Sequence, residues 1–209
     1  MLANSTTTDV ELDAVLWKEM KEGNEFAFRE IFETYSNLLF QYGITITQDR
    51  ELVKDCMQEL FISVWTNRNT IGMARSIKYY LFFSLRRLIL KKISKTRKFF
   101  SLPSFNNVDL IVEAQDQAIL KKEINIKYRL IISGALETLP ARQKEIIFLK
   151  FYQELKNEEI EKIMNLNNQV VRNTLCKALN SLRKTLGKRQ MSSQFLFLLA
   201  LLVYLSFIY

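Results

Sequence analysis

The segment from Leu136 to Leu186 constrains the fold most strongly, because it has the pattern of two helices joined by a tight turn. A first helix beginning near Asn157 would bury one apolar face. A three-residue turn through Leu166 follows, and Asn167 can then cap a second helix by accepting a hydrogen bond from an unpaired backbone N–H. This order of elements predicts a helix-turn-helix.

The second helix of this motif is predicted to have two contrasting faces. An apolar stripe at helical spacing includes Val171, Leu175 and Leu182, which leaves polar and basic side chains on the opposite face. Such side chains suit the edges of DNA bases and the phosphates. An ordinary helical hairpin with a solvated polar face is the alternative from these residues alone. The candidate DNA-binding residues are Asn167, Gln169, Arg172, Asn173 and Lys177.

The rest of the chain also favours helices. Its 209 residues include only five glycines and two prolines, so turn and strand signals are scarce while 3.6-residue periodicity dominates. We therefore predict an all-α fold of two small helical domains joined by a linker, the C-terminal one a helix-turn-helix, followed by an apolar tail. The predicted segments are an N-terminal domain over residues 8–98, a linker over 99–123, the helix-turn-helix domain over 124–187 and the tail over 191–209.

The composition excludes several functional classes. The chain has no histidine, which removes His-based catalytic triads, Cys/His zinc sites and HExxH metalloenzymes. We therefore predict no enzymatic activity, no metal site and no cofactor. Cys56 and Cys176 lie far apart on the apolar side or edge of predicted helices, as expected of reduced cysteines in a cytoplasmic protein rather than of a disulfide framework.

Charge is distributed in alternating blocks along the chain. Residues 1–59 carry 12 acidic and 5 basic side chains, whereas residues 60–108 carry 10 basic and no acidic ones. The pattern then repeats, with 10 acidic and 8 basic side chains in residues 109–161 and 7 basic and no acidic ones in residues 162–209. Two acid-free blocks indicate two separate contacts with a polyanion. Compositional drift in a lysine-rich proteome would explain one block more easily than two.

The N-terminal domain is predicted to contain four helices. Asp9 is placed to cap the first and Gly23 to end it, and Asn24 and Gly43 have the same roles for the second. The third turns a wide apolar stripe inward and leaves acidic side chains at its outer face. The expected third and fourth helices run from about Asp49 to Trp65 and from about Ser76 to Lys98.

The predicted fourth helix combines basic residues with aromatic ones. Lysine and arginine bind phosphates, and aromatic rings beside them can stack on unpaired bases. For the aromatic residues, the spacing fits a small aromatic core equally well, and both interpretations remain open. The candidates for contact with nucleic acid are Tyr80, Phe82, Phe83, Arg86, Arg87, Lys91 and Lys95.

Two stretches of the N-terminal domain resemble the extracytoplasmic-function sigma factors of bacterial RNA polymerase. Residues 55–65 are similar to the family's Asp-x-x-Gln-Glu-x-Phe-x-x-x-Trp stretch, in a helix that docks on the clamp helices of the largest catalytic subunit. Residues 80–87 are similar to the family's Tyr-Leu-Tyr-x-x-x-Arg-Asn, which lies where the minus-ten promoter element is opened. Arg87 stands where asparagine is usual, and Lys91 where aspartate is common. The polymerase-binding residues that this resemblance implies are Asp55, Gln58, Glu59 and Phe61.

The C-terminal domain extends the resemblance. Residues 135–143 match the start of the family's second domain, and residues 171–183 match the helix that reads the minus-thirty-five element. The departures are Glu154, where glycine is usual, and Glu161, where alanine is usual. In total the resemblance covers about residues 24–100 and 124–187, most of the chain.

The resemblance implies a cytoplasmic factor that binds core RNA polymerase, recognises promoter DNA and opens it for transcription initiation, restrained by an anti-sigma factor. The acid-bearing third helix would supply the polymerase surface, and the two acid-free blocks would supply the DNA surfaces. A stand-alone helix-turn-helix regulator would lack the docking stretch and the second basic block. A DNA recombinase would need an α/β catalytic domain, whose parallel-sheet pattern the N-terminal domain does not show. A membrane-tethered adaptor is a third alternative, raised by the C-terminal tail.

The C-terminal tail is almost purely apolar over residues 195–209. It is shorter than the ~20 residues that a membrane-spanning helix requires. Lys184, Lys188 and Arg189 precede it, as basic residues do on the cytoplasmic side of a membrane segment. The tail fits either docking on this protein or on a partner's groove, or contact with a membrane surface, and both interpretations remain open.

Overall fold

The computed structural model describes residues 5–74, 76–99 and 132–188, which form helices and connecting turns with no strand among them. The all-α prediction is thus confirmed. The chain divides into two compact units, one on residues 1–102 and 162–164 and one on residues 103–161 and 165–209. Its elements are α1 Ser5–Lys21, α2 Glu25–Ile46, α3 Arg50–Thr66, α4 Ile77–Phe99, a helical stretch over residues 132–137, α6 Ala141–Ile147, the π-helical turn η1 Phe148–Tyr152, α7 Asn157–Met164 and α8 Asn168–Lys188.

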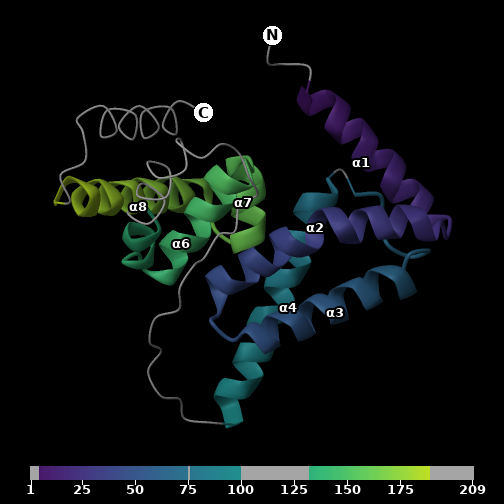
Figure 1. The fold of residues 1–209 in the computed structure, drawn as a ribbon, viewed down its shortest axis with the longest axis horizontal. Helices are drawn as coiled ribbons and strands as arrows, with labels where there is room; N and C mark the ends of the chain where they lie inside the picture. The colour runs from purple at the N-terminus through teal and green to yellow at the C-terminus, as the bar shows by residue number, and fades with distance from the viewer. Residues whose placement is uncertain (1–4, 75, 100–131, 189–209) are drawn as a thin grey trace, which may run out of the picture. The chain divides into compact units, whose positions relative to one another are not determined.

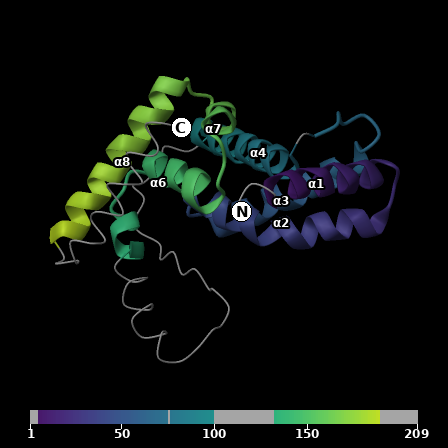
Figure 2. The same cartoon turned by 90° about the horizontal axis from the view of Figure 1, so that it is seen from above.

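The first unit is a bundle of α1 to α4. Helix α2 packs against each of the other three, and α3 and α4 also pack on one another (Figure 1). Figure 2 shows the same bundle from above, with α1 lying along α2. The buried side chains at its centre include Trp17, Leu39, Tyr42, Phe82 and Leu85, each with no exposed surface. Each lies on the inward stripe of its helix, so burial follows the 3.6-residue period.

The ends of the helices in this unit are set by local residues. Gly23 ends the turn after α1 in a left-handed conformation, with φ of 91°. The Asn24 side chain then accepts hydrogen bonds from the backbone N–H groups of Phe26 and Ala27 at 2.9 and 3.3 Å, so the predicted cap of α2 is confirmed. Helix α1 begins at Ser5, four residues before the predicted cap at Asp9.

The predicted end of the second helix at Gly43 is wrong. Helix α2 continues through Gly43 to Ile46, and Gly43 is buried where the helix meets α3. A Cβ at this position would lie 2.4 Å from Cγ1 of Val53, so the glycine permits close helix approach rather than a turn. Helix α8 likewise continues through Gly187 to Lys188.

The second unit is built around the long helix α8, on which α6 packs. Residues Ile160, Ile163 and Met164 of α7 are buried, as expected for the first helix of a helix-turn-helix. The apolar stripe of α8 is also buried over Val171, Leu175, Ala178, Leu179, Leu182 and Leu186. The burial of these two apolar stripes follows the 3.6-residue period of each helix.

The two cysteines are free thiols in separate units. Cys56 is fully buried in α3, and this burial raises the pKa of its thiol. Cys176 is only half-buried, so it lies at the edge of the apolar stripe of α8. No helix among the described residues is long and apolar enough to span a membrane. The predicted linker, apart from Phe99 at the end of α4, and the apolar tail lie outside the described residues.

Candidate polymerase and nucleic-acid interfaces

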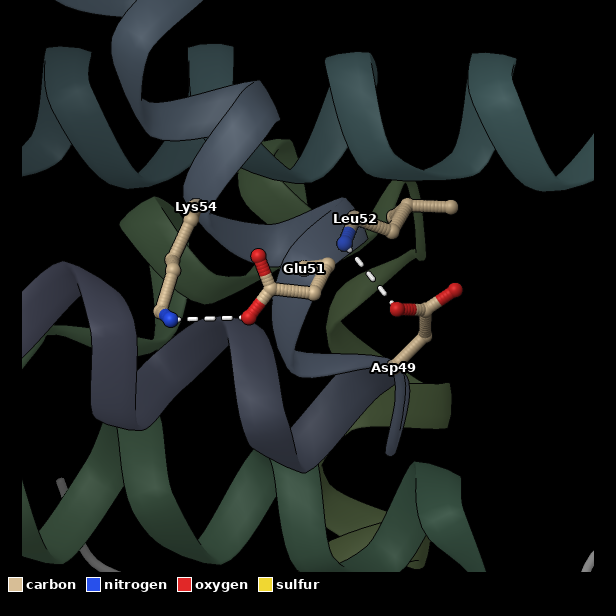
Figure 3. Close-up of polar contacts among 4 residues, drawn as sticks. All are labelled: Asp49, Glu51, Leu52 and Lys54. Carbon is tan, nitrogen blue, oxygen red and sulfur yellow. Dashed lines mark hydrogen bonds and ion pairs between the residues drawn. The ribbon is translucent and has the colours of Figure 1, made fainter.

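Helix α3 carries the residues predicted to bind polymerase, and its start is fixed by side chains of its own first turn. The Asp49 carboxylate accepts a hydrogen bond from the Leu52 backbone N–H at 3.0 Å, which caps the helix (Figure 3). Glu51 pairs with Lys54 at 2.8 Å one turn on, and both side chains are exposed. The register of α3 is thus set at its N-terminus, upstream of the predicted site.

The structure brings three of the predicted polymerase-binding residues together on the exposed side of α3. Asp55, Gln58 and Glu59 line a shallow hollow of about 520 Å³, which we call the α3 shoulder. Lys92 of α4 also lines it and forms an ion pair with Glu59 at 3.1 Å. The hydrogen bond to Glu59 raises the pKa of Lys92. The shoulder therefore combines acidic and amide groups with one cation contributed by the neighbouring helix.

Phe61, the fourth predicted polymerase-binding residue, lies elsewhere. Its side chain is 5% exposed and forms part of the floor of an open groove between α2 and α3, with a volume of about 980 Å³. Phe28, Phe32 and Trp65 complete this aromatic groove, with Phe32 and Phe61 in edge-to-face contact at 4.8 Å. Phe32 contributes exposed aromatic surface to the groove, since its side chain is 45% exposed. Ile62, exposed at 58%, lies between the groove and the α3 shoulder and lines both.

The aromatic residues of α4 have different environments. Phe82 is fully buried and packs on Tyr42 with ring centroids 4.8 Å apart. It is therefore a core residue here, and its predicted contact with DNA is not supported. Tyr80 is half-buried with its ring against the edge of Trp17, and the half-buried Phe83 stacks on Tyr79. Tyr80 and Phe83 both retain surface that a base could contact.

The basic residues of α4 remain largely at the surface. Arg87, Lys91 and Lys95 are exposed, whereas Arg86 is half-buried. Arg87 and Lys91 are one helical turn apart, and so are Lys91 and Lys95, so the three follow one side of the helix. A row of cations at this spacing matches a phosphate backbone better than a single compact anion.

The loop that precedes α4 is held by side chains of α1, an arrangement that the sequence did not reveal. The Trp17 indole N–H donates a hydrogen bond to the Gly72 carbonyl at 3.0 Å, and the Lys21 ammonium donates one to the Ile71 carbonyl at 2.5 Å. Both donors belong to α1, 50 or more residues away in sequence. Contacts at such separation leave no periodic signal in the sequence, so only the fold reveals them.

The turn of the helix-turn-helix is held by residues close in sequence. The Asn167 side chain accepts a hydrogen bond from the Val170 N–H at 2.8 Å, so its predicted role as the cap of α8 is confirmed. Asn165 has a positive φ of 52°, a conformation that asparagine tolerates. Glu161, where the resemblance has alanine, accepts a hydrogen bond from the Asn168 side chain and so ties α7 to α8. Glu154, where glycine is usual, has a positive φ of 55°.

The predicted DNA-reading residues lie along the solvent side of α8. Gln169, Asn173 and Lys177 are exposed at successive turns, and the Gln169 side chain donates a hydrogen bond to that of Asn173 at 3.3 Å. Arg172 is half-buried, and its Nε is shielded from solvent without a hydrogen-bond partner among the described residues. The helix therefore presents amide and cationic groups in the spacing that base-edge contacts require.

Both units match known families of protein domains. Residues 31–99 match Sigma-70 region 2, and residues 129–182 match Sigma-70, region 4. The chain belongs to the ECF family of RNA polymerase sigma factors. Among its relatives is the ECF RNA polymerase sigma factor SigM of Bacillus subtilis, 23% identical over 154 residues, with 74% of this chain and 91% of SigM covered. Another is SigL of Mycobacterium tuberculosis, 26% identical over 165 residues, with 76% of this chain and 88% of SigL covered.

Solved structures of sigma factors share the fold. CnrH in complex with the cytosolic domain of CnrY matches with a TM-score of 0.54 at 18% identity, covering 84% of this chain and 97% of CnrH. The sigma factor RpoE in complex with the anti-sigma factor NepR from Bartonella quintana matches with a TM-score of 0.56 at 17% identity, covering 77% and 96%. In this sigma factor, α3 and α4 lie in region 2, whereas α6, α7 and α8 as far as Leu182 lie in region 4.

Proposed function

We propose that this chain is an alternative sigma factor, which binds core RNA polymerase and directs promoter recognition and DNA opening at transcription initiation. One observation carries the proposal: a region 2 unit and a region 4 unit occur in one chain, each with a helix whose exposed side is basic. A stand-alone helix-turn-helix regulator needs only the second unit. The two functions therefore differ in whether promoter-specific activity requires core polymerase.

The decisive experiment is run-off transcription with core RNA polymerase and a library of promoter fragments. We expect discrete transcripts only when both the factor and the core enzyme are present, and the active fragments will reveal the promoter motif. Specific binding of the fragments by the factor alone, without factor-dependent transcripts, would favour the stand-alone regulator.

The polymerase contact is proposed at the α3 shoulder and the adjoining aromatic groove. The acids at positions 55 and 59 are exposed on a helix whose other side is buried, and Ile62 joins the shoulder to the groove. An apolar patch bordered by charge is typical of a protein-binding surface. These features support docking of one protein helix or loop across α3.

Charge reversal tests this contact. The double variant Asp55→Lys with Glu59→Lys should abolish co-purification with core polymerase while helicity is retained, because like charges across an interface cost several kcal/mol. The matched control is Glu22→Lys with Glu30→Lys, which makes the same charge change at exposed residues outside the shoulder and groove. Unchanged co-purification of the shoulder variant would move the docking surface elsewhere.

The minus-ten contact is proposed at α4 and the loop before it, acting on opened DNA. Arg86, Arg87, Lys91 and Lys95 would hold the backbone, and Tyr80 and Phe83 would contact an unstacked base. Replacing Tyr80 and Phe83 by alanine should reduce permanganate reactivity of unpaired thymines more than it reduces initial promoter binding. Equal loss of both signals, with loss of the fold, would instead make these rings part of the aromatic core.

The upstream contact is proposed at the solvent side of α8, with Asn167, Gln169, Arg172, Asn173 and Lys177 facing the major groove. A side chain that reads a base edge contributes about 1–3 kcal/mol of discrimination. Arg172→Ala should therefore relax preference at one or two promoter positions, whereas Lys184→Ala, an exposed cation further along α8, should weaken binding evenly. An unchanged positional preference in Arg172→Ala would require a different register of the helix on DNA.

A restraining partner also follows from this function. The solved relatives named above were determined with the cytosolic domain of CnrY and with the anti-sigma factor NepR, and we propose that an anti-sigma factor also restrains this chain in the cytoplasm.

The apolar tail is proposed to govern where the factor is located in the cell or which partner restrains it. Truncation after Gln190 should keep run-off activity and improve solubility, while it changes the membrane-bound fraction or the response to the restraining partner. Loss of promoter-specific initiation would assign the tail to the structural core.

A further inference from the structure

The loop between α3 and α4 connects the proposed polymerase contact to the proposed DNA contact. Its first residues form a turn next to α3, since the Ile71 N–H donates to the Asn67 carbonyl within the loop at 3.0 Å and the Arg68 guanidinium donates to the Trp65 carbonyl of α3 at 2.9 Å. Beyond them Met73 is 60% exposed. We call residues 67–74 the pre-α4 loop.

Three side chains of α1 form hydrogen bonds with the pre-α4 loop and the start of α4, and we call these three bonds the grip of α1. Lys21 and Trp17 bind the carbonyls of two consecutive residues, Ile71 and Gly72, at 2.5 and 3.0 Å. One turn before Trp17, the Asp13 carboxylate accepts a hydrogen bond from the Ile77 backbone N–H at 3.1 Å, at the first residue of α4. The three side chains are spaced by four residues each, so they follow one side of α1.

These bonds are the polar contacts that hold the backbone at Ile71 and Gly72. A Cβ at Gly72 would meet no atom within 4 Å, so the side of this residue where a side chain would lie is open. The donors are themselves well anchored, because Trp17 is fully buried and its ring contacts Tyr80 of α4 at 5.1 Å. Asp13 is anchored by a second hydrogen bond, which its other carboxylate oxygen accepts from the Tyr35 hydroxyl at 3.1 Å.

We propose that α1 is a positioning element for promoter opening, in which Asp13, Trp17 and Lys21 hold the pre-α4 loop and the start of α4 in the conformation that receives unpaired DNA. The three residues act through the loop and do not themselves touch DNA. The inference rests on the proposed role of α4 and its loop in DNA opening. When these hydrogen bonds are lost, the loop samples other conformations. The apparent affinity for unpaired DNA then falls in proportion to the fraction of molecules whose loop remains in the DNA-binding conformation.

Two lysines of α1 provide a matched test. Lys21→Met and Lys18→Met each remove one positive charge from the last turn of the same helix. Only Lys21 binds the loop, whereas Lys18 is exposed and faces Glu22 at 3.9 Å. Lys21→Arg keeps a cationic donor, and Trp17→Phe removes the indole N–H while it keeps an aromatic ring against Tyr80.

The measurement uses full-length factor assembled with core RNA polymerase and two forms of one active promoter fragment. One form is fully duplex, and the other is a fork-junction fragment whose minus-ten non-template bases are already unpaired. If about one tenth of the loop population stays competent, Lys21→Met should bind the fork-junction fragment about tenfold more weakly than wild type. Lys18→Met and Lys21→Arg should bind like wild type, and Trp17→Phe should follow Lys21→Met. Affinity for core polymerase and for the duplex fragment should be unchanged in all four variants.

The outcomes separate this inference from the function on which it depends. If wild-type holoenzyme does not prefer the fork-junction fragment, the proposed role of α4 and its loop fails. If wild type prefers it but Lys21→Met matches Lys18→Met, the positioning role of α1 is overturned while the function stands. Equal loss of core binding and of fork-junction binding in Lys21→Met would make the grip a general support of the fold. Should Lys21→Met fail to fold, the comparison of Trp17→Phe with wild type decides in the same way.

Discussion

The two connectors that lead into the DNA-facing helices are held in opposite ways. The turn before α8 is fixed by neighbours in sequence. The Asn167 side chain caps α8 by accepting a hydrogen bond from the N–H of Val170, three positions on, and Glu161 accepts one from the side chain of Asn168, seven positions on. The loop before α4 is fixed by α1, through hydrogen bonds that join residues 50 to 64 positions apart. One connector therefore forms with its own helices, whereas the other forms only when α1 has docked on the bundle.

This difference has consequences for stability and for dynamics. Contacts that are local in sequence close small loops and form early, whereas non-local contacts depend on completion of the tertiary fold. We expect the pre-α4 loop to loosen whenever the packing of α1 on the first unit is weakened. The helix-turn-helix turn should keep its geometry as long as α7 and α8 remain paired.

The largest effect on this comparison should come from Gly43→Ala, which weakens tertiary packing in the first unit. The added Cβ would lie 2.4 Å from Cγ1 of the fully buried Val53, whose β-branched side chain has little rotamer freedom. Overpacking costs typically 1–3 kcal/mol, and an approach of 2.4 Å places this site at the upper end of that range. The higher helix propensity of alanine offsets about 1 kcal/mol, so we expect a net loss of ~2 kcal/mol. Both tryptophans, Trp17 and Trp65, lie in the first unit, so their fluorescence during urea unfolding reports its stability alone.

Gly187→Ala is the matched control in the second unit. Its Cβ would meet nothing within 4 Å, and the residue is exposed near the end of α8. Alanine should there be neutral or stabilising by up to ~1 kcal/mol, seen by circular dichroism with tryptophan fluorescence unchanged. Equal destabilisation by both substitutions would show that Gly43 is not a point of close helix approach.

The sequence predicted what depends on local spacing. The caps at Asn24 and Asn167, the start of α3 near Asp49, the apolar stripes and the helix-turn-helix order all depend on residues within one or two helical turns, and the structure has them. The predictions failed where a residue's role depends on a distant partner. A glycine in a sequence indicates a turn as readily as a close approach of two helices, so Gly43 was predicted to end its helix. The residue that it approaches, Val53, belongs to another helix, and the spacing along the sequence does not reveal that contact.

The same reason accounts for what the spacing left open at the candidate site. Spacing along α4 cannot distinguish Phe82, which packs on Tyr42, from Tyr80, which keeps part of its surface. The aromatic groove was missed because a helical stripe predicts burial without showing whether another element covers it. The grip of Lys21 on the pre-α4 loop was missed because a lysine at a helix C-terminus ordinarily interacts only with its own helix.

The second prediction compares the two connectors directly, through one capping residue of each. Asp13→Ala removes the acceptor for the Ile77 N–H and for the Tyr35 hydroxyl, whereas Asn167→Ala removes a single acceptor, for the Val170 N–H. Loss of one cap costs ~1 kcal/mol, so we expect ~1.5 kcal/mol for Asp13→Ala and ~1 kcal/mol for Asn167→Ala. Hydrogen exchange should localise the first effect to residues 71–80 and the second to residues 165–171. Exchange that increases over the whole first unit in Asp13→Ala would make this residue a part of the core rather than of the connector.

The third prediction addresses strain stored within the second unit. Glu154 has a φ of 55°, a left-handed conformation that costs an ordinary residue about 1–2 kcal/mol relative to glycine. Glycine also raises the entropy of the unfolded chain, so Glu154→Gly should stabilise the second unit by a net ~0.5–1 kcal/mol. Glu154→Ala removes the same charge but keeps the Cβ, so it should give no gain. A gain of equal size in both variants would attribute the effect to charge. The readout is circular dichroism, with the tryptophan signal of the first unit unchanged.

The smallest effect on stability should come from two ion pairs of α3, one within the helix and one that joins it to α4. Lys54 pairs with Glu51 one turn away at 2.8 Å, and both side chains are more than half exposed. Lys92 reaches Glu59 from another helix at 3.1 Å and is only 34% exposed. Exposed pairs contribute about 0.2–1 kcal/mol, so we expect Lys54→Met to cost ~0.3 kcal/mol and Lys92→Met to cost ~0.7 kcal/mol, because the second pair also holds α4 on α3.

Double-mutant cycles with Glu51→Gln and Glu59→Gln, read by tryptophan fluorescence, isolate each pair. Both coupling energies should shrink in 1 M salt. A coupling for the local pair as large as that of the long-range pair would show that sequence distance does not set what these contacts contribute to the first unit.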